Sequence, residues 1–223
     1  SWSYAFLRWF HGPASRMLVA TKSMERELVD RGFVNIGRWS RGVDLDLFSP
    51  NPSHKTSNCP ILLYVGRVAP EKNIGAFLGV NIEGIKRVIG DGPELQSLAK
   101  KYPDVEFVGY KHGDELAAEM RKADCFVFPS RTDTFGLVIL ESLASGVPVA
   151  GYPAPGPIDL IENGYNGWIS DNLTESIYKA LKANRQDCRK FAERFSWERC
   201  TDQFISHIQP VHTTRPANVT KNS

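Results

Sequence analysis

The sequence predicts an α/β protein built on a doubly wound parallel sheet. From Ile61 onward, short apolar runs alternate with longer stretches of helical periodicity, and this alternation is typical of parallel strands joined by covering helices. The apolar runs are nearly uninterrupted, as in strands that are buried on both faces. With 223 residues, 42% of them hydrophobic, the chain can bury one large core, or one core and part of another.

The expected elements of the main sheet follow one another in regular order. Strands are predicted at 61–65, 85–89, 105–108, 125–128, 147–151 and 168–169. Helices are predicted after Lys72, at 94–101, 114–122, 135–145 and 157–162, and from Leu173 onward. Ligands of such sheets bind beyond the carboxyl ends of the strands. The loops that follow the strands are therefore where we expect a site.

The first part of the chain predicts a smaller unit. Strands are expected at 16–20 and 34–39, with a helix between them that Thr21 or Ser23 caps and Gly32 ends. The segment that follows is rich in Pro, Ser, Asn and Lys, which is typical of a linker. We therefore expect five parts: a unit at 1–48, a linker at 49–60, a main domain at 61–195, a last helix at 196–209 and a disordered tail at 210–223.

Composition and charge argue against several classes of protein. The net charge is +2 and the basic residues are scattered, so no nucleic-acid partner is expected. The cysteines lack metal-site spacing, and reduced thiols indicate a cytoplasmic protein. No apolar run has the roughly 18 residues of a membrane span. A cluster of mostly aromatic residues lies near the start and comprises Trp2, Tyr4, Phe6, Leu7, Trp9 and Phe10. We expect it to pack on a missing neighbouring segment; the alternatives are that it faces an acceptor or the inner membrane surface.

The loop after the first strand of the main sheet carries two cations. Gly66 lets a ligand approach the backbone, and Arg67 and Lys72 follow it. Arg grips a phosphate through its planar fork, whereas Lys acts as a point charge. Two cations in a loop are usually just solvated. At the carboxyl end of a strand, however, they predict contacts to a diphosphate.

The next loop reads Gly90-Asp91-Gly92-Pro93-Glu94 and allows a tight approach of the backbone before a helix. It is not a G-x-G-x-x-G dinucleotide motif, because Leu95 stands where the third glycine belongs. The sequence also lacks a G-x-x-x-x-G-K-[ST] phosphate loop. These two absences argue against a dehydrogenase and against a Walker-type ATPase.

The central stretch, Ser130 to Gly146, joins a buried strand to an apolar helix and carries two acids. Asp133 precedes the helix and Glu141 lies within it, eight positions later. Eight helical residues span about 12 Å, so the two acids can reach different parts of one ligand. The helix N-terminus between them suits a phosphate because of its free amides and positive dipole end. We therefore expect this stretch to hold a sugar nucleotide.

Together these motifs resemble the retaining GT-B glycosyltransferases of the group 1 type, which include bacterial phosphatidylinositol mannosyltransferases. The resemblance implies that a Rossmann-like C-terminal domain binds an NDP-sugar donor, either a UDP- or a GDP-sugar. It also implies that the first residues are the end of a second, acceptor-side Rossmann-like domain. The segments that carry it are 66–73, 90–94, 105–109, the central stretch, Gly42-Val43-Asp44 and Phe195-Ser196-Trp197-Glu198.

The resemblance also assigns roles to residues. It places Arg67 and Lys72 on the diphosphate, Glu141 on the ribose and Asp133, where the family usually has Glu, on the sugar hydroxyls. Of these, Arg67, Lys72 and Asp133 are the expected catalytic residues. No cofactor or metal is implied. The rest of the expected donor site comprises Gly66, Gly90, Gly92, Gly109, Tyr110, Phe135, Gly136 and Leu137, the last three through backbone amides.

The implied activity is transfer of a hexosyl group, with retention, to an acceptor that the sequence does not identify, such as a lipid or a polysaccharide. Because most of the acceptor domain is not expected within the chain, we expect this fragment alone to be inactive. Two alternatives stay open. One is a non-catalytic module that binds nucleotide sugars, and the other is a sugar-nucleotide epimerase of the same architecture.

Overall fold

The computed structural model describes residues 2–54, 58–133 and 135–208, and its main body is a six-stranded parallel sheet. The strand order is β5-β4-β3-β6-β7-β8, so the chain winds outward from β3 and β6 in both directions and confirms the predicted doubly wound class. The point where the order reverses, between β3 and β6, is where such sheets bind ligands. The strands are β3 (Ile61–Val65), β4 (Ile85–Ile89), β5 (Glu106–Gly109), β6 (Cys125–Phe128), β7 (Val149–Gly151) and β8 (Gly167–Ile169).

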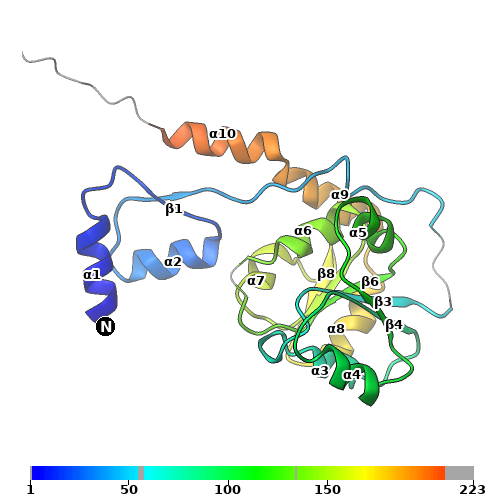
Figure 1. Ribbon diagram of the computed structural model, residues 1–223. Helices are drawn as coiled ribbons and strands as arrows, with labels where there is room; N and C mark the ends of the chain where they lie inside the picture. The colour runs from blue at the N-terminus through cyan, green and yellow to red at the C-terminus, as the bar shows by residue number, and fades with distance from the viewer. Residues whose placement is uncertain (1, 55–57, 134, 209–223) are drawn as a thin grey trace, which may run out of the picture.

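Helices cover both faces of this sheet (Figure 1). On one face lie α5 (Gly113–Met120), α6 (Leu137–Ala144) and α9 (Arg185–Ala192), and on the other lie α3 (Ile74–Leu78), α4 (Leu95–Lys101) and α8 (Leu173–Ala180). The central strand β6 shows the division. Phe126 and Phe128 belong to the first core and Cys125 and Val127 to the second, because successive side chains of a strand point to opposite faces.

The start of the chain contains a second, two-stranded sheet. Strands β1 (Met17–Val19) and β2 (Ile36–Arg38) pair in parallel. Between them runs α2 (Lys22–Asp30), where the Thr21 hydroxyl accepts a hydrogen bond from the Met24 amide at 3.2 Å. Gly32 follows the helix with a φ of 82°. A capping hydroxyl and a left-handed glycine thus mark the two ends of the helix.

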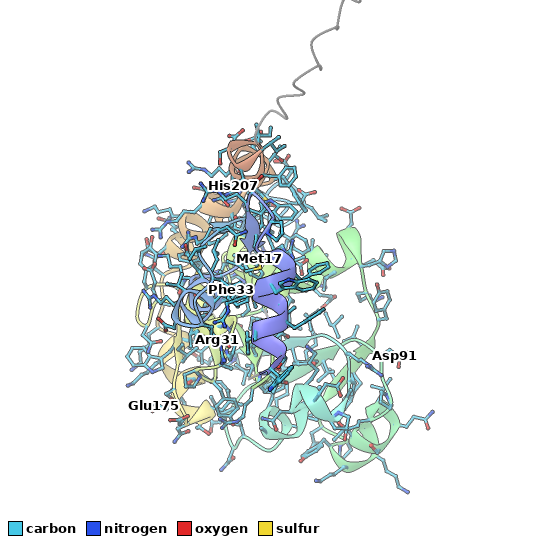
Figure 2. All side chains as sticks on the ribbon, turned by 90° about the vertical axis from the view of Figure 1, so that its left-hand side faces the viewer. Met17, Arg31, Phe33, Asp91, Glu175 and His207 are labelled. Atoms are coloured by element: carbon cyan, nitrogen blue, oxygen red, sulfur yellow. The ribbon has the colours of Figure 1, made fainter. Side chains whose placement is uncertain are left out.

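The aromatic cluster near the start lies on α1 (Trp2–His11). The helix packs on α2 through Tyr4, whose hydroxyl donates to Glu27 at 2.9 Å and whose ring lies 3.8 Å from the Arg31 guanidinium. Figure 2 looks onto this helix, with the labelled Arg31 beside it. The side chains of Trp2 and Trp9 are exposed. None of the helices that the structure describes is long and apolar enough to cross a bilayer.

The last helix, α10 (Trp197–His207), returns to the first unit and lies along it (Figure 1). The Ser40 amide and hydroxyl both donate to Gln203, at 3.0 and 2.9 Å. Just before α10, the Val43 amide donates to the Phe195 carbonyl at 2.8 Å. The chain therefore crosses between the two units twice, and the two crossings lie side by side.

The predicted division into five parts stays a prediction. Within the linker, residues 55–57 lie outside the described residues, and so does the predicted disordered tail at 210–223. The main body also contains the 3₁₀ turn η2 (Glu193–Phe195), the short helix α7 (Pro157–Leu160) and the 3₁₀ turn η1 (Pro70–Lys72). The last two contribute to the region described next.

Candidate functional site

A cavity of about 500 Å³ opens at the carboxyl ends of β3 and β4. It brings together residues from loops that are far apart in the sequence, and five of them were predicted: Gly66, Arg67, Gly90, Tyr110 and Glu141. Arg67 and Glu141 therefore face one space, as their predicted contacts to adjacent parts of one ligand require. The remaining lining residues are Leu47, Phe48, Val65, Ile89, Asp91, Lys111, His112, Gly113 and Leu116.

Backbone contacts between the loops after β3 and β4 build the wall of this cavity. The Gly66 amide donates to the Ile89 carbonyl at 3.0 Å, and the Val68 amide to the Asp91 carbonyl at 2.9 Å. Gly90 has a φ of 142°, and a Cβ atom there would lie 1.9 Å from the Gly66 carbonyl oxygen. Only glycine permits that approach. The sequence therefore requires glycine at this position for the packing of two loops as well as for access of a ligand.

Gly92 and Gly109 support the cavity from outside its lining. A Cβ atom at Gly92 would lie 2.3 Å from the Val68 carbonyl oxygen, so this glycine also permits loop packing. Gly109 ends β5 with a φ of 81°, and its carbonyl accepts from the Gly90 amide at 2.9 Å. Direct contact of Gly92 or Gly109 with a ligand stays a prediction.

Lys72, in the loop that also carries Arg67, forms an ion pair with Asp133. Lys72 Nζ lies 2.7 Å from Asp133 Oδ2, and the two side chains are 30% and 18% exposed. Lys72 ends η1 in the loop after β3, whereas Asp133 comes from the loop after β6. Because these strands are neighbours, the loops meet at the reversal point of the sheet. The two predicted groups therefore contact each other directly, which the sequence did not indicate.

Arg67 is less constrained than Lys72. Its side chain is 66% exposed and approaches the Glu71 carboxylate at 3.5 Å. An exposed pair of this kind contributes little to stability. The guanidinium can therefore turn toward an anion in the cavity at small cost.

The Glu141 carboxyl group lies on the cavity wall, one turn into α6. Burial raises the pKa of Glu141 to about 6, because removal from water disfavours the charged form. At neutral pH the group is therefore a partly desolvated carboxylate. Such a group favours ligands that bring hydrogen-bond donors, for example the hydroxyls of a ribose.

The start of α6 differs from the prediction. The helix was expected from Phe135, but it begins at Leu137 because Gly136 takes a left-handed conformation with a φ of 78°. The helix N-terminus still lies between the two acids. However, of the residues between the two acids only those from Leu137 onward are helical. The estimate of about 12 Å for a continuous helix therefore does not apply to the distance between Asp133 and Glu141.

Phe135, Gly136 and Leu137 do not line the 500 Å³ cavity. Phe135 lines a second cavity, of about 290 Å³, together with Thr21 and Arg38 of the first unit and Asp159 of α7. The units also meet directly there, because the Ser23 amide donates to Asp159 at 2.9 Å. The predicted contacts of the three backbone amides with a ligand stay predictions.

Sequence reasoning missed part of the wall beyond β5. Tyr110 and His112 stack with ring centroids 5.8 Å apart, and Lys111 lies between them in the sequence. Tyr110 was predicted as a site residue, whereas Lys111 and His112 were not, because no motif marks them; their place directly after a sheet strand was the available signal. In Figure 2 the labelled Asp91, after β4, and Glu175, on α8, lie on opposite sides of the view. The lining of the cavity comes from the ends of β3, β4 and β5, from α5 and α6, and from Leu47 and Phe48.

The segment Asp44-Leu45-Asp46 has two acids one residue apart, and the first of them has a structural role. The Asp44 carboxylate accepts from the amides of Asp46 and Leu47, at 3.0 and 2.9 Å. Both bonds go to Oδ1, so this carboxylate stabilises a local turn of the backbone. Within the part of the chain that the structure describes, no group of three or more His, Cys, Asp or Glu side chains could hold a metal ion.

Solved structures with the same fold include the lipopolysaccharide outer core galactosyltransferase WaaB, with a TM-score of 0.71 at 18% identity, covering 87% of this chain and 61% of that one. The chain superimposes on Staphylococcus aureus TarM with a TM-score of 0.74 at 18% identity, covering 93% of this chain and 46% of that one. It also matches Anabaena HepE in complex with UDP and glucose, with a TM-score of 0.69 at 19% identity and coverage of 86% and 62%. These similarities establish the GT-B type of fold, a Rossmann-like domain with part of a second.

Sequence relatives establish the family. A GDP-mannose-dependent alpha-mannosyltransferase of Corynebacterium glutamicum is 36% identical over 94% of this chain and 56% of its own length. The corresponding protein of Mycobacterium tuberculosis is 31% identical over 96% of this chain and 61% of its own length. The chain thus spans less than two thirds of these relatives. The family described as glycosyl transferases group 1 matches residues 59–187, and the chain belongs to this family.

Proposed function

We propose that this chain is the donor-binding part of a retaining glycosyltransferase that transfers a hexosyl group from an NDP-sugar. The observation that carries the proposal is the cavity that Arg67 and Glu141 share, together with the Lys72–Asp133 ion pair. In this proposal the two cations lie between the two carboxylates at the edge of the sheet. A nucleotide sugar offers the complementary order of hydroxyls, diphosphate and hydroxyls.

In the proposed complex the nucleoside occupies the 500 Å³ cavity. The base lies by Tyr110 and the apolar side chains of Ile89 and Leu116, and the ribose hydroxyls donate to Glu141. Arg67 binds the diphosphate from the open side of the cavity. The second phosphate then lies at Lys72 and the sugar at Asp133. Each of these side chains gives up part of its contact with the other in order to bind the ligand.

The chemistry that follows is cleavage of the bond between the anomeric carbon and the phosphate oxygen. Negative charge grows on the departing diphosphate, and it is stabilised by Lys72, which Asp133 holds, and by Arg67 once its guanidinium has turned toward the ligand. The acceptor hydroxyl attacks from the same face, and its proton passes to the departing phosphate oxygen. Configuration at the anomeric carbon is thereby retained, and we expect transfer without added metal.

The choice of donor is open to a direct test. The relatives are named GDP-mannose-dependent, which supports GDP-mannose, whereas HepE holds UDP and glucose, which supports UDP-glucose. Titration calorimetry of this chain with GDP- and UDP-sugars should show binding of at least one donor, and Glu141→Ala should weaken it. No binding of any nucleotide sugar would overturn the proposal.

Transfer itself is tested in the full-length protein. Arg67→Ala and Lys72→Ala should each lower kcat by about 100-fold or more, because each removes a charge that stabilises the leaving group. Lys182→Ala, which changes an exposed cation outside the site, serves as the matched control. Undiminished transfer in both site variants would end this assignment. Product formed from the donor alone, without an acceptor, would point instead to an epimerase.

A further inference from the structure

Asn73 has an unusual backbone conformation in the middle of the cationic loop. Its φ is 51°, and it is the one non-glycine residue with a positive φ among those that the structure describes. Its amide donates to the Pro70 carbonyl at 3.0 Å and ends η1. Its carbonyl accepts from the Ala76 amide at 3.0 Å at the start of α3. The residue is thus the joint between two helical turns, directly after Lys72.

The Asn73 side chain reaches across to the other loop of the site. Its Nδ2 donates to the Pro129 carbonyl oxygen at 3.0 Å. Pro129 follows β6 and leads into the segment that carries Asp133. One amide group therefore ties the loop that carries Lys72 to the loop that carries Asp133.

The opposite end of the cationic loop has its own anchor. The Tyr64 hydroxyl donates to the Arg67 carbonyl at 2.8 Å, and the ring is almost fully buried beneath Gly66. Burial raises the pKa of Tyr64, so the hydroxyl stays a neutral donor. Tyr64 thus holds the loop at Arg67, whereas the bond from Asn73 fixes its end at Lys72.

We propose that Asn73 is a positioning residue that holds Lys72 against Asp133, and thereby shapes the end of the site that receives the second phosphate and the sugar. This inference rests on the proposed function. Since the amide touches neither the 500 Å³ cavity nor Glu141, its effect is confined to the diphosphate-sugar end. Binding of the nucleoside part does not depend on it.

Two substitutions separate the conformation of Asn73 from its hydrogen bond. Asn73→Gly keeps the left-handed conformation and removes the amide. Asn73→Asp keeps the size and tolerates the conformation, but its carboxylate has no donor for the Pro129 carbonyl and repels it. If the amide positions Lys72, both variants should lose function at the same end of the ligand.

The experiment compares two ligands by calorimetry on the chain as it stands: the donor NDP-sugar that binds the unaltered protein, and the matching nucleoside monophosphate. We expect Asn73→Gly to weaken NDP-sugar binding by about tenfold, the value of one hydrogen bond, and Asn73→Asp by at least as much. Binding of the monophosphate should stay unchanged, which also shows that each variant is folded.

A second measurement tests whether Asn73 acts through Lys72. In a Lys72→Met background, adding Asn73→Gly should cause no further loss of NDP-sugar affinity, because the group being positioned is absent. Unchanged NDP-sugar affinity in both Asn73 variants, equal losses for both ligands, or additive losses in the double variant would each overturn the inference. In those three cases the unaltered protein still binds the donor. If the proposed function were wrong, the unaltered protein would bind no nucleotide sugar at all.

Discussion

Glu141 shows how the fold prepares a single functional group. Its carboxyl lies on an apolar helix within the body of the protein, where burial raises its pKa from the usual 4.5 to about 6. The sequence indicated that Glu141 belongs to the site, because it lies in the central stretch that follows a buried strand, and the family resemblance placed it on the ribose. The shift could not be predicted, since it depends on the packing of loops from elsewhere in the chain.

The raised pKa predicts a pH dependence of stability that Glu141→Gln removes. A proton binds Glu141 more tightly in the folded state than in the unfolded state. The resulting stability is fully present below about pH 4.5 and is lost as the pH rises through 6. Relative to the unaltered protein, Glu141→Gln should therefore gain up to about 2 kcal/mol in free energy of unfolding between acid and neutral pH.

Urea unfolding across this pH range measures the effect. Glu83→Gln changes an exposed glutamate and provides the control, whose pH profile should match that of the unaltered protein. If Glu141→Gln shows that same profile, the carboxyl is not desolvated as the structure indicates.

Pairs of side chains at the site were harder to predict than single ones. Lys72 and Asp133 were both expected at the donor site, each for its own part of a ligand. Their direct contact at 2.7 Å follows from the pairing of β3 with β6, which brings together loops that are far apart in the sequence. The Asn73 amide belongs to the same junction, and nothing in its sequence surroundings indicated its partner.

At the scale of elements, continuous apolar runs predicted the strands well. The bounds of β3, β4 and β6 agree with the sequence expectation, because a glycine or a proline follows each of these strands directly. The helix starts were less exact. At α6 the left-handed Gly136 delays the start to Leu137, and a local propensity cannot reveal that conformation.

The close packing of the loops after β3 and β4 predicts that adding one methyl group at Gly90 lowers the stability of the protein strongly. In Gly90→Ala the new Cβ would lie 1.9 Å from the Gly66 carbonyl oxygen, and the positive φ adds strain. We expect a loss of about 3 kcal/mol or more in the free energy of unfolding, together with weaker nucleotide binding.

Gly75→Ala is the matched control for this substitution. Gly75 lies inside α3, and a Cβ atom there meets nothing within 4 Å. Alanine favours a helix over glycine by up to about 1 kcal/mol, so this variant should be slightly more stable than the unaltered protein. Denaturant unfolding of both variants is sufficient. A Gly90→Ala variant as stable as Gly75→Ala would contradict the close approach of the two loops.

At the scale of the whole molecule, the two units contact each other through side chains that lie far apart in the sequence. Asp159 of α7 accepts from both the amide and the hydroxyl of Ser23, at the start of α2. A carboxylate at this end of a helix is favoured by the free amides and the dipole. The sequence predicted two units and their caps, but a contact across 136 positions depends on how the units are arranged.

Asp159→Ala should loosen the first unit without unfolding the main body. The change removes both hydrogen bonds to Ser23, so hydrogen exchange at the first turn of α2 should become faster, by about tenfold. Exchange in β3 and β6 should stay as slow as before. Asp171→Ala, at an exposed position, is the control. Unchanged exchange at α2 would mean that Asp159 does not hold the units together.

The paired crossings between the units have a mechanical consequence. Val43 lies against Phe195 and Ser196, and Gly42 packs so closely on the Trp197 ring that a Cβ atom would come within 2.6 Å of it. Because the two crossing segments are bonded to each other, we expect them to form one common connection between the units. Loss of the Ser23–Asp159 contact should then separate the units at α7 while this connection stays in place.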